Sequence, residues 1–342
     1  MTENLPTHAA ERPETDASAD RMEKILYEVK RVVVGQDGFL ERVMVALLAQ
    51  GHLLVEGVPG LAKTLTVKTL AATVTGSFKR IQFTPDLVPA DLVGTRIYNQ
   101  KSGDFSTALG PVFTNLLLAD EINRAPAKVQ SALLEVMQER QVTIAGTSYA
   151  VPRPFLVMAT QNPVETEGTY PLPEAQVDRF MMKVLLDYPS DDEEFIIAER
   201  ALADPVQVAA VATIDELAAM QRLARQVYVD PALLQYAVRL VSATRWPDRH
   251  GLGELTRFIT YGASPRATIN LIDGARALAL LRRRSYALPE DITAIAPDVL
   301  RHRVALSYEA LAENVSASDV IAQIMARIPA PPKPMQHDRL AA

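Results

Sequence analysis

The sequence predicts an α/β domain whose parallel sheet is covered by helices, followed by an all-α domain. From residue 21 to residue 188, short apolar runs alternate with amphipathic stretches of helix length, which is the pattern of a parallel α/β layer. From Pro189 onward strand-like runs are not recognisable, and long stretches rich in Ala, Leu and Arg follow. Asp-Pro, Ser-Pro and Leu-Pro-Glu-Asp sequences punctuate these stretches as helix starts.

The length of 342 residues suffices for two domains of about 150 residues each. We expect the α/β domain over residues 21–188 and the helical domain over residues 189–328. Residues 1–20 are polar, acidic and poor in aliphatic side chains, so they are predicted to form a disordered tail. Residues 329–342 contain three prolines within Pro331–Pro334 and are expected to form a second flexible tail.

The composition excludes several classes of protein. Hydrophobic residues make up 48% of the chain, which supports a sizeable core, and the net charge is −6. Proteins that bind nucleic acid usually carry a basic surplus, so that class is disfavoured. The absence of cysteine excludes disulfides, thiolate metal sites and iron–sulfur clusters. No apolar run approaches the roughly 18 residues of a membrane span, and the N-terminal residues do not resemble a signal peptide, so we expect a cytoplasmic protein.

Five short runs are expected to form the sheet, four of them largely apolar and one weaker. Buried parallel strands read as such runs, and ligands gather beyond their carboxyl ends. In chain order the candidates are His52–Glu56, the weaker Phe78–Phe83, Asn115–Ala119, Pro154–Ala159 and Phe180–Leu186.

The first strand leads into a phosphate-type loop and then a helix over Leu65–Val74. Glycines let backbone N–H groups turn toward a phosphate, and the helix N-terminus adds its positive end. Lys63 is predicted to reach the β- and γ-phosphates, and the Thr64 hydroxyl to bind Mg²⁺. The usual spacing has glycine where this chain has Ala62, a substitution that is costly if the backbone there needs a glycine conformation. The whole loop reads Gly57, Val58, Pro59, Gly60, Leu61, Ala62, Lys63, Thr64, followed by Leu65.

Two further strand ends carry polar side chains that suit nucleotide hydrolysis. The third candidate strand runs into Asp120 and Glu121. Asp120 suits a Mg²⁺ partner, and Glu121 is placed to polarise an attacking water. After the fourth candidate strand, Asn162 presents an amide that could orient the same water or contact the γ-phosphate, although an Asn-Pro turn is the simpler interpretation of this residue alone.

Two insertions are predicted to form hairpins. β-prone residues flank Asn99–Asp104 between Asp91 and Pro111, which predicts a hairpin inserted in a helix. A second hairpin is expected over Gln141–Tyr149, after a helix over Pro126–Arg140.

Taken together, these motifs resemble the AAA+ ATPases and, within them, the MoxR-type ATPases. The resemblance covers about Val32 to Ile328 and makes Ala62 typical, because a GxPGxAKT loop belongs to this group. The matching stretches are VVVGQD (32–37), GHLLVEGVPGLAKT (51–64), FTPDLVPADLVG (83–94), DEINRAP (120–126), ATQNP (159–163), YPLPEAQVDRF (170–180) and SPRA (264–267).

The resemblance implies a role for each motif residue. Lys63 and Thr64 correspond to Walker A, and Asp120 and Glu121 to Walker B. Asn162 corresponds to sensor 1. The remaining implied positions are Arg179 as the arginine finger given to a neighbouring subunit, with Arg124 as the reserve candidate, Arg266 as sensor 2 in the helical lid, and Val34, Gly35 and Gln36 beside the adenine.

The implied function is Mg²⁺-dependent ATP hydrolysis by a ring, a hexamer in this group. The implied work is chaperone-like remodelling or maturation of a client protein, often with von Willebrand factor A domain proteins and including metal insertion. In related ATPases the two hairpins line the pore or face the substrate. Three alternatives remain open: a magnesium-chelatase-like subunit, a nucleic-acid motor, for which Arg282–Arg284 and Arg301–Arg303 could be cited, and a scaffold that binds ATP without turnover.

Overall fold

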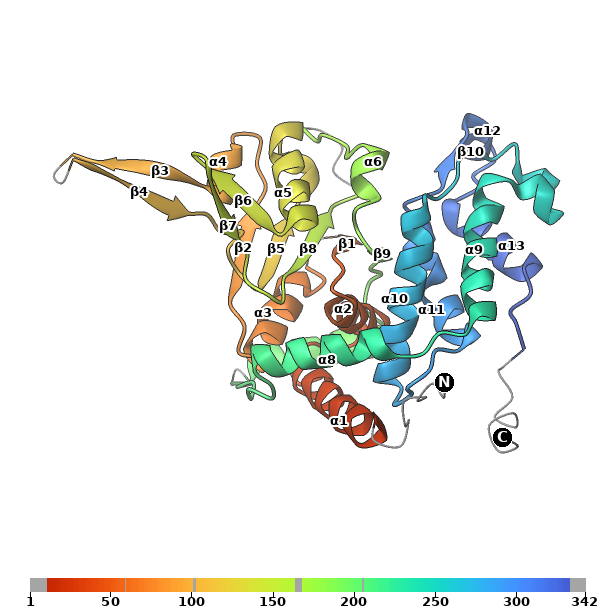
Figure 1. Cartoon of the computed structure of the whole chain (residues 1–342), viewed down its shortest axis with the longest axis horizontal. Helices are drawn as coiled ribbons and strands as arrows, with labels where there is room; N and C mark the ends of the chain where they lie inside the picture. Colours follow the sequence, from red (N-terminus) through yellow and green to blue (C-terminus); the bar gives the residue numbers. More distant parts are fainter. Residues whose placement is uncertain (1–10, 59, 101–102, 164–167, 205, 333–342) are drawn as a thin grey trace, which may run out of the picture. The chain divides into compact units, whose positions relative to one another are not determined.

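The computed structural model describes residues 11–58, 60–100, 103–163, 168–204 and 206–332 (Figure 1). The chain divides into two compact units. Lys24–Ala219 form one, and the described residues of Met1–Glu23 and Met220–Ala342 form the other. Two helices, α1 (Glu11–Lys30) and α8 (Ile214–Gln226), pass from one unit into the other.

The first unit contains a parallel five-stranded sheet in the order β2-β5-β8-β1-β9. All five expected strands are present, shifted by at most two residues at their ends. Their bounds are β1 (Leu53–Glu56), β2 (Phe78–Gln82), β5 (Leu116–Asp120), β8 (Leu156–Gln161) and β9 (Met182–Leu185).

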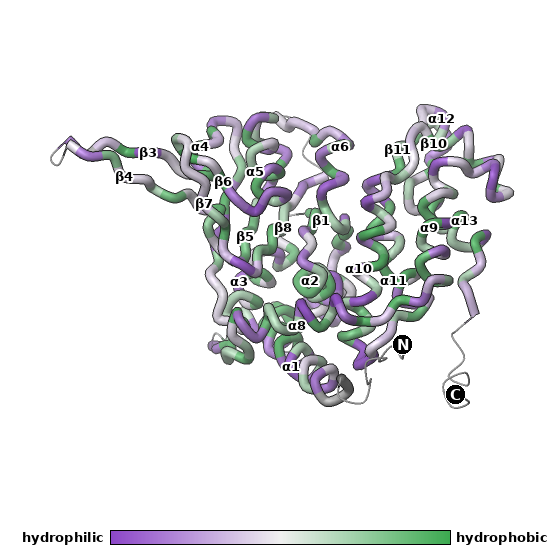
Figure 2. Tube along the Cα trace, viewed as in Figure 1, coloured by the Kyte–Doolittle hydropathy of each residue, from purple (hydrophilic) through white to green (hydrophobic). Residues whose placement is uncertain are grey.

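Helices bury both faces of this sheet. On one face, Leu54, Leu117 and Val157 belong to a core cluster with Leu133 and Val136 of α5. The strand residues that alternate with them are also buried, and α3 packs against β2 and β5. The hydrophobic α2 (Figure 2) packs against β9. The helical segments of this unit include α2 (Asp37–Ala49), α3 (Lys63–Thr73), α4 (Pro89–Val93), the 3₁₀ turn η1 (Ile122–Arg124), α5 (Ala127–Glu139), α6 (Glu174–Val177) and α7 (Asp191–Leu202).

Both expected hairpins form. β3 (Gly94–Asn99) and β4 (Asp104–Leu109) make a ribbon that extends away from the sheet (Figure 1). This hairpin follows α4, and in the described chain no helix resumes between β4 and β5, so the expectation that it interrupts a helix is wrong. The second hairpin, β6 (Gln141–Ile144) and β7 (Thr147–Ala150), follows α5.

The other unit is mainly helical. Serine and aspartate side chains cap several of its helices; Ser264, for example, accepts a hydrogen bond from Arg266 N at 3.2 Å. Its helical elements, apart from the portions of α1 and α8, are α9 (Pro231–Arg245), η2 (Pro247–His250), η3 (Gly253–Leu255), α10 (Pro265–Leu281), α11 (Pro289–Leu300), α12 (Tyr308–Ala312) and α13 (Ala317–Arg327).

The structure departs from the sequence expectations in the helical unit in one respect. Two short strands are present after Pro189, where the sequence shows no recognisable strand-like run: β10 (Ile259–Tyr261) pairs with β11 (Ala305–Leu306) as a small antiparallel sheet. Each strand is only two or three residues long and its partner is more than forty residues away in the chain, so no local pattern marks either one.

The structure also differs from the predicted domain bounds. The first helix begins at Glu11, inside the segment predicted as a disordered tail, and buries Ala19, Met22 and Ile25 at helical spacing. The chain after α7 remains with the α/β unit up to Ala219. Val211 N and Ala212 N donate hydrogen bonds of 2.8 and 3.1 Å to Thr73 O at the end of α3, which holds this segment on the α/β unit. Residues 1–10 and 333–342 of the two expected tails lie outside the described residues.

Candidate functional site

The loop between β1 and α3 leads into a helix start whose backbone N–H groups can serve as hydrogen-bond donors. Gly60 and Ala62 have φ angles of +89° and +53°, so both adopt left-handed backbone. Ala62 is the N-cap of α3, and no side chain caps this helix start. The first N–H groups of α3 are therefore available to an anion, whose charge the helix dipole favours. Of the predicted loop residues, Pro59 lies outside the described residues.

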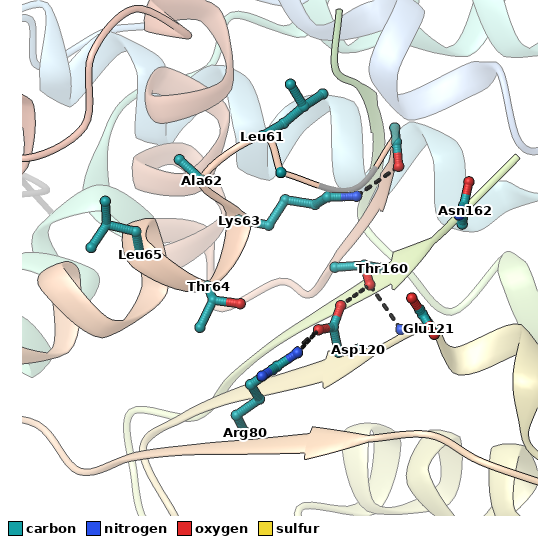
Figure 3. Close-up of a pocket in the computed structure, with 12 residues that line it drawn as sticks. Leu61, Ala62, Lys63, Thr64, Leu65, Arg80, Asp120, Glu121, Thr160 and Asn162 are labelled. Carbon is teal, nitrogen blue, oxygen red and sulfur yellow. Dashed lines mark hydrogen bonds and ion pairs between the residues drawn. The ribbon is translucent and has the colours of Figure 1, made fainter. Parts of the chain in front are cut away.

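A cavity of about 370 Å³ lies at this helix start, at the carboxyl edge of the sheet (Figure 3). It brings together residues from the ends of β1, β5 and β8, as the sequence predicts for parallel strands. The cavity is lined by Gly57, Gly60, Leu61, Ala62, Lys63, Thr64, Leu65, Arg80, Asp120, Glu121, Thr160 and Asn162.

Lys63 provides an ammonium group inside this cavity. Its Nζ donates a hydrogen bond of 2.7 Å to Gly57 O, across the loop (Figure 3). Burial lowers the pKa of Lys63, while the carboxylates of Asp120 and Glu121 act in the opposite direction. The lysine is thus placed between two acids and the anion-binding helix start, where a polyphosphate would take over its hydrogen bond to the loop.

Asp120 ends β5 with both carboxylate oxygens occupied by protein donors. Thr160 Oγ1 donates a hydrogen bond of 2.6 Å to Asp120 Oδ1, and the same Oγ1 accepts one of 2.8 Å from Glu121 N. On the other oxygen, Arg80 Nε and Nη2 lie 3.1 and 2.6 Å from Asp120 Oδ2 (Figure 3). The carboxylate is therefore held in one orientation at the rim of the cavity.

Glu121 follows in left-handed backbone, with φ of +55°. Gln82 Nε2 donates a hydrogen bond of 2.8 Å to Glu121 Oε2. Arg124 Nε lies 2.8 Å from the same oxygen, so the reserve candidate for an inter-subunit cation pairs here within its own chain. Asn162, buried at 8% exposure, lines the cavity just beyond β8.

Sequence reasoning missed three residues that shape this site: Arg80, Gln82 and Thr160. Arg80 and Gln82 alternate on β2, and β2 pairs with β5 so that Gln82 lies opposite Asp120. The polar alternation of residues 80 and 82 in a weak strand is a signal that the sequence contains. This signal points to the site only once it is known that β2 lies beside β5, and the sequence of neither strand predicts that order.

A second cavity, of about 790 Å³, shares the loop residues Gly60, Leu61, Ala62 and Leu65 with the first. Val34 and Gln36 line it, and Gln36 Nε2 donates a hydrogen bond of 2.9 Å to Asp187 O. Its other walls are mostly aliphatic and suit a flat aromatic ring. They include Val32, Val33, Ala72, Ile197, Ala201, Ala203, Val206 and Val208.

Gly35, the third residue predicted at this place, determines the path of the chain. Its φ is +64°, and a Cβ built on it would lie 2.4 Å from Glu193 Oε1 of α7. Glu193 also accepts a hydrogen bond of 2.9 Å from Ser190 N in the capping box of α7. Glycine at this position therefore permits the close approach of the Val34–Gln36 segment and α7.

Of the two arginines that the resemblance singles out, Arg179 belongs to the α/β unit and does not line its cavity. Arg179 follows α6 and is partly buried, and in the described part of the chain its Nε is buried without a hydrogen-bond partner. Arg266 lies in the first turn of α10, which belongs to the helical unit.

The fold and the loop define a P-loop-type nucleotide-binding protein. The family described as "ATPase family associated with various cellular activities (AAA)" matches residues 52–182, and the AAA lid domain matches residues 256–324. A crystal structure from Cytophaga hutchinsonii, of a protein described as a candidate ATPase, superposes with a TM-score of 0.89 at 48% identity and covers 94% of this chain and 98% of that one.

Two relatives identify the family within this class of nucleotide-binding proteins. "Chaperone MoxR1" of Mycobacterium tuberculosis is 53% identical over 92% of this chain and 84% of its own length. "Protein MoxR" of Methylorubrum extorquens is 32% identical over 89% of this chain and 93% of its own length. The chain belongs to the MoxR-type AAA+ ATPases, and the resemblance drawn from its motifs is confirmed.

The described helices contain no candidate for a membrane span, since none combines the necessary length with sufficient apolar character.

Proposed function

We propose that this ATPase hydrolyses ATP with Mg²⁺ in a ring of subunits, a hexamer by kinship, and uses the cycle to remodel or mature a client protein. The observation that carries the proposal is the pair of adjoining cavities, one lined by Lys63, Asp120 and Glu121 and the other largely aliphatic. Their shared loop suits a molecule with a polyphosphate at one end and an aromatic base at the other. In this arrangement Val34, Gly35 and Gln36 lie beside the base.

The phosphates are assigned to the loop and to the start of α3. Backbone N–H groups at the helix start receive the anion, and Lys63 moves its ammonium from Gly57 O to the β- and γ-phosphates. The residues proposed to hold the nucleotide are Gly57, Val58, Pro59, Gly60, Leu61, Ala62, Lys63, Thr64 and Leu65, with Asp120 at the facing strand end.

The donor set of the cavity fits Mg²⁺ bound together with nucleotide. The Thr64 hydroxyl and the Asp120 carboxylate line the same cavity, and both are oxygen donors. Among the described residues no group of three or more His, Cys, Asp or Glu side chains could hold a metal by itself. Mg²⁺ suits such a sparse site, since it is usually bound by one or two protein oxygens plus phosphates and waters. When bound, it neutralises charge on the transferred phosphate.

Hydrolysis needs a positioned water and stabilised charge. Glu121 is proposed to orient the water, with Gln82 and Arg124 holding its carboxylate until then. Asn162 orients the water or contacts the γ-phosphate. Arg179 is proposed to act on the ATP of the neighbouring subunit, and Arg266 to reach the γ-phosphate from the lid. Loss of these contacts on hydrolysis lets lid and interface relax, which is the work stroke.

The proposed client is a protein, and kinship implies a von Willebrand factor A domain protein as its companion. The relative named "Chaperone MoxR1" supports the chaperone-like part of this assignment. We do not propose nucleic acid as a partner, since the net charge is −6. We propose the cytoplasm as the location, because such a cycle needs a steady supply of ATP.

Calorimetric titration and turnover measurements test the proposal. Wild type should bind ATP and lose turnover in excess EDTA, and Lys63→Ala should lose ATP binding. Exposed Lys128 on α5 provides a matched control, since Lys128→Ala removes the same charge and Lys128 does not line the cavity. Glu121→Gln should bind ATP and turn over far more slowly, and sedimentation with ATP should show a ring. Unchanged ATP binding by Lys63→Ala would contradict the assignment of the loop.

The Glu121→Gln variant, whose slow turnover is expected to keep ATP bound, also tests for a client protein. Glu121→Gln in ATP should retain a client protein in a pull-down that wild type in ADP releases. Equal recovery in both states would contradict nucleotide-dependent remodelling.

A further inference from the structure

Arg80 occupies a position at the site that none of the assigned motifs explains. It lies on β2, which is separated from β1 and its loop by the two strands β5 and β8, and its side chain lines the phosphate cavity (Figure 3). Its guanidinium donates twice to Asp120 Oδ2, at 2.6 and 3.1 Å, and Nη2 also donates to Gln82 Oε1 at 2.9 Å. Arg80 thus contacts the acid proposed to face the metal.

The two oxygens of Asp120 differ in how firmly their partners are fixed. Thr160, on Oδ1, is 1% exposed and is itself bonded to Glu121 N. Arg80, on Oδ2, has a side chain that is 49% exposed, whereas that of Asp120 is 16% exposed. A long, half-exposed side chain can leave its partner at little cost, because surface ion pairs are weak. Oδ2 is therefore the oxygen whose partner can be exchanged.

We propose that Arg80 is an exchangeable counter-ion of Asp120. Its guanidinium neutralises and orients the carboxylate while no divalent cation is present, and it yields Oδ2 to the cation that enters with the nucleotide. This inference rests on the proposed Mg²⁺ dependence. Arg80 is a positioning residue in this view: it keeps Asp120 in the geometry set by Thr160 and competes with the metal for one oxygen.

The test measures metal affinity rather than turnover. Full-length protein saturated with ADP is titrated with Mn²⁺, and free Mn²⁺ is followed by electron paramagnetic resonance. Arg80→Gln removes the competing charge. Lys79→Gln is the matched control, because Lys79 is the adjacent exposed residue of β2, carries the same charge, and points to the opposite face of the strand.

Arg80→Gln should bind Mn²⁺ about three- to fivefold more tightly than wild type, the factor that corresponds to an ion pair of about 1 kcal/mol. Lys79→Gln should bind as wild type does. In an Asp120→Asn background the effect of Arg80→Gln should disappear, because the competition concerns this carboxylate. ADP affinity in EDTA should be the same for Arg80→Gln and wild type.

Several results would overturn the proposal. Unchanged or weaker Mn²⁺ binding by Arg80→Gln would show that Arg80 does not compete with the metal. A loss of ADP affinity in EDTA would make Arg80 a phosphate ligand instead. An effect that persists in Asp120→Asn would be a general effect of charge. If wild type itself binds no Mn²⁺ in the presence of ADP, the proposed metal dependence fails as well. If wild type binds Mn²⁺ and Arg80→Gln binds it with the same affinity, only the role of Arg80 is refuted.

Discussion

The hydroxyl of Thr160 donates a hydrogen bond of 2.6 Å to Asp120 Oδ1, which joins the end of β8 to the end of β5. The same oxygen accepts from Glu121 N at 2.8 Å, and Thr160 is 1% exposed. One buried hydroxyl thus fixes both acids at the rim of the phosphate cavity.

Replacing Thr160 by valine keeps the shape of the side chain and removes this hydroxyl. Asp120 Oδ1 and Glu121 N then lose a buried partner, so Thr160→Val should destabilise the protein by about 1–3 kcal/mol. Turnover should fall as well, because the two acids are no longer held in register. Urea unfolding and ATPase rates measure the two effects. Thr160→Ser, which retains the hydroxyl, should recover most of the turnover, and a fully active Thr160→Val would contradict the positioning role.

A methyl group at Gly35 should disturb the neighbourhood of the larger cavity. Gly35→Ala places Cβ 2.4 Å from Glu193 Oε1 and keeps a φ of +64°, a conformation that costs an alanine about 1–2 kcal/mol. We expect lower stability and weaker ATP binding, measured by thermal unfolding and calorimetry. Gly38→Ala is the matched control, since a Cβ there meets nothing within 4 Å and α2 favours alanine. Equal behaviour of the two variants would refute the close-approach argument.

His52 should make stability depend on pH below neutrality. Burial lowers the pKa of His52 from 6.5 to about 3, the nearby charge of Arg140 acts in the same direction, and the neutral ring accepts a hydrogen bond of 3.0 Å from Val157 N. In the unfolded chain the ring takes up a proton near pH 6.5. Its contribution is therefore fully present above that pH and is lost as the pH falls toward 3, by about 1.4 kcal/mol per pH unit.

Urea unfolding at pH 7.5, 6.5 and 5 measures this effect. From pH 6.5 to 5, wild type should lose about 2 kcal/mol more stability than His52→Gln, in which this titration is absent. The comparison between the two proteins removes the contribution of other titrating groups. Parallel stability curves would show that His52 does not hold its neutral form in the folded state.

Arg179 should act on the nucleotide of a neighbouring subunit. Arg179→Ala alone should bind ATP without hydrolysing it, with a loss of about 10³-fold or more in turnover. Mixing it with Glu121→Gln subunits should restore part of the activity, because some interfaces then combine an intact Glu121 with an intact Arg179. A surface ion pair would change stability by about 1 kcal/mol or less and leave turnover intact. Failure of the mixture to recover any activity would contradict action across the interface.

Local chemistry in the sequence was sufficient to predict the phosphate loop, the strands and the pair of acids. Each motif can be recognised from a few neighbouring residues: an apolar run that ends in Asp120-Glu121, and a glycine-bearing loop that ends in Lys63-Thr64. Parallel strands bring such ends to one edge of a sheet, so their meeting at a single cavity followed from the class of fold. The two hairpins were likewise predictable from β-prone residues around turn residues.

The tertiary structure alone decided which side chains hold those acids. Arg80 reaches Asp120 and Gln82 reaches Glu121 because β2 lies beside β5, although 38 positions separate Gln82 from Asp120 in the chain. The pairing of β10 with β11 and the extension of the α/β unit to Ala219 also depend on contacts distant in sequence. Strand order and long-range hydrogen bonds arise from packing of the whole chain, and no window of neighbouring residues encodes them.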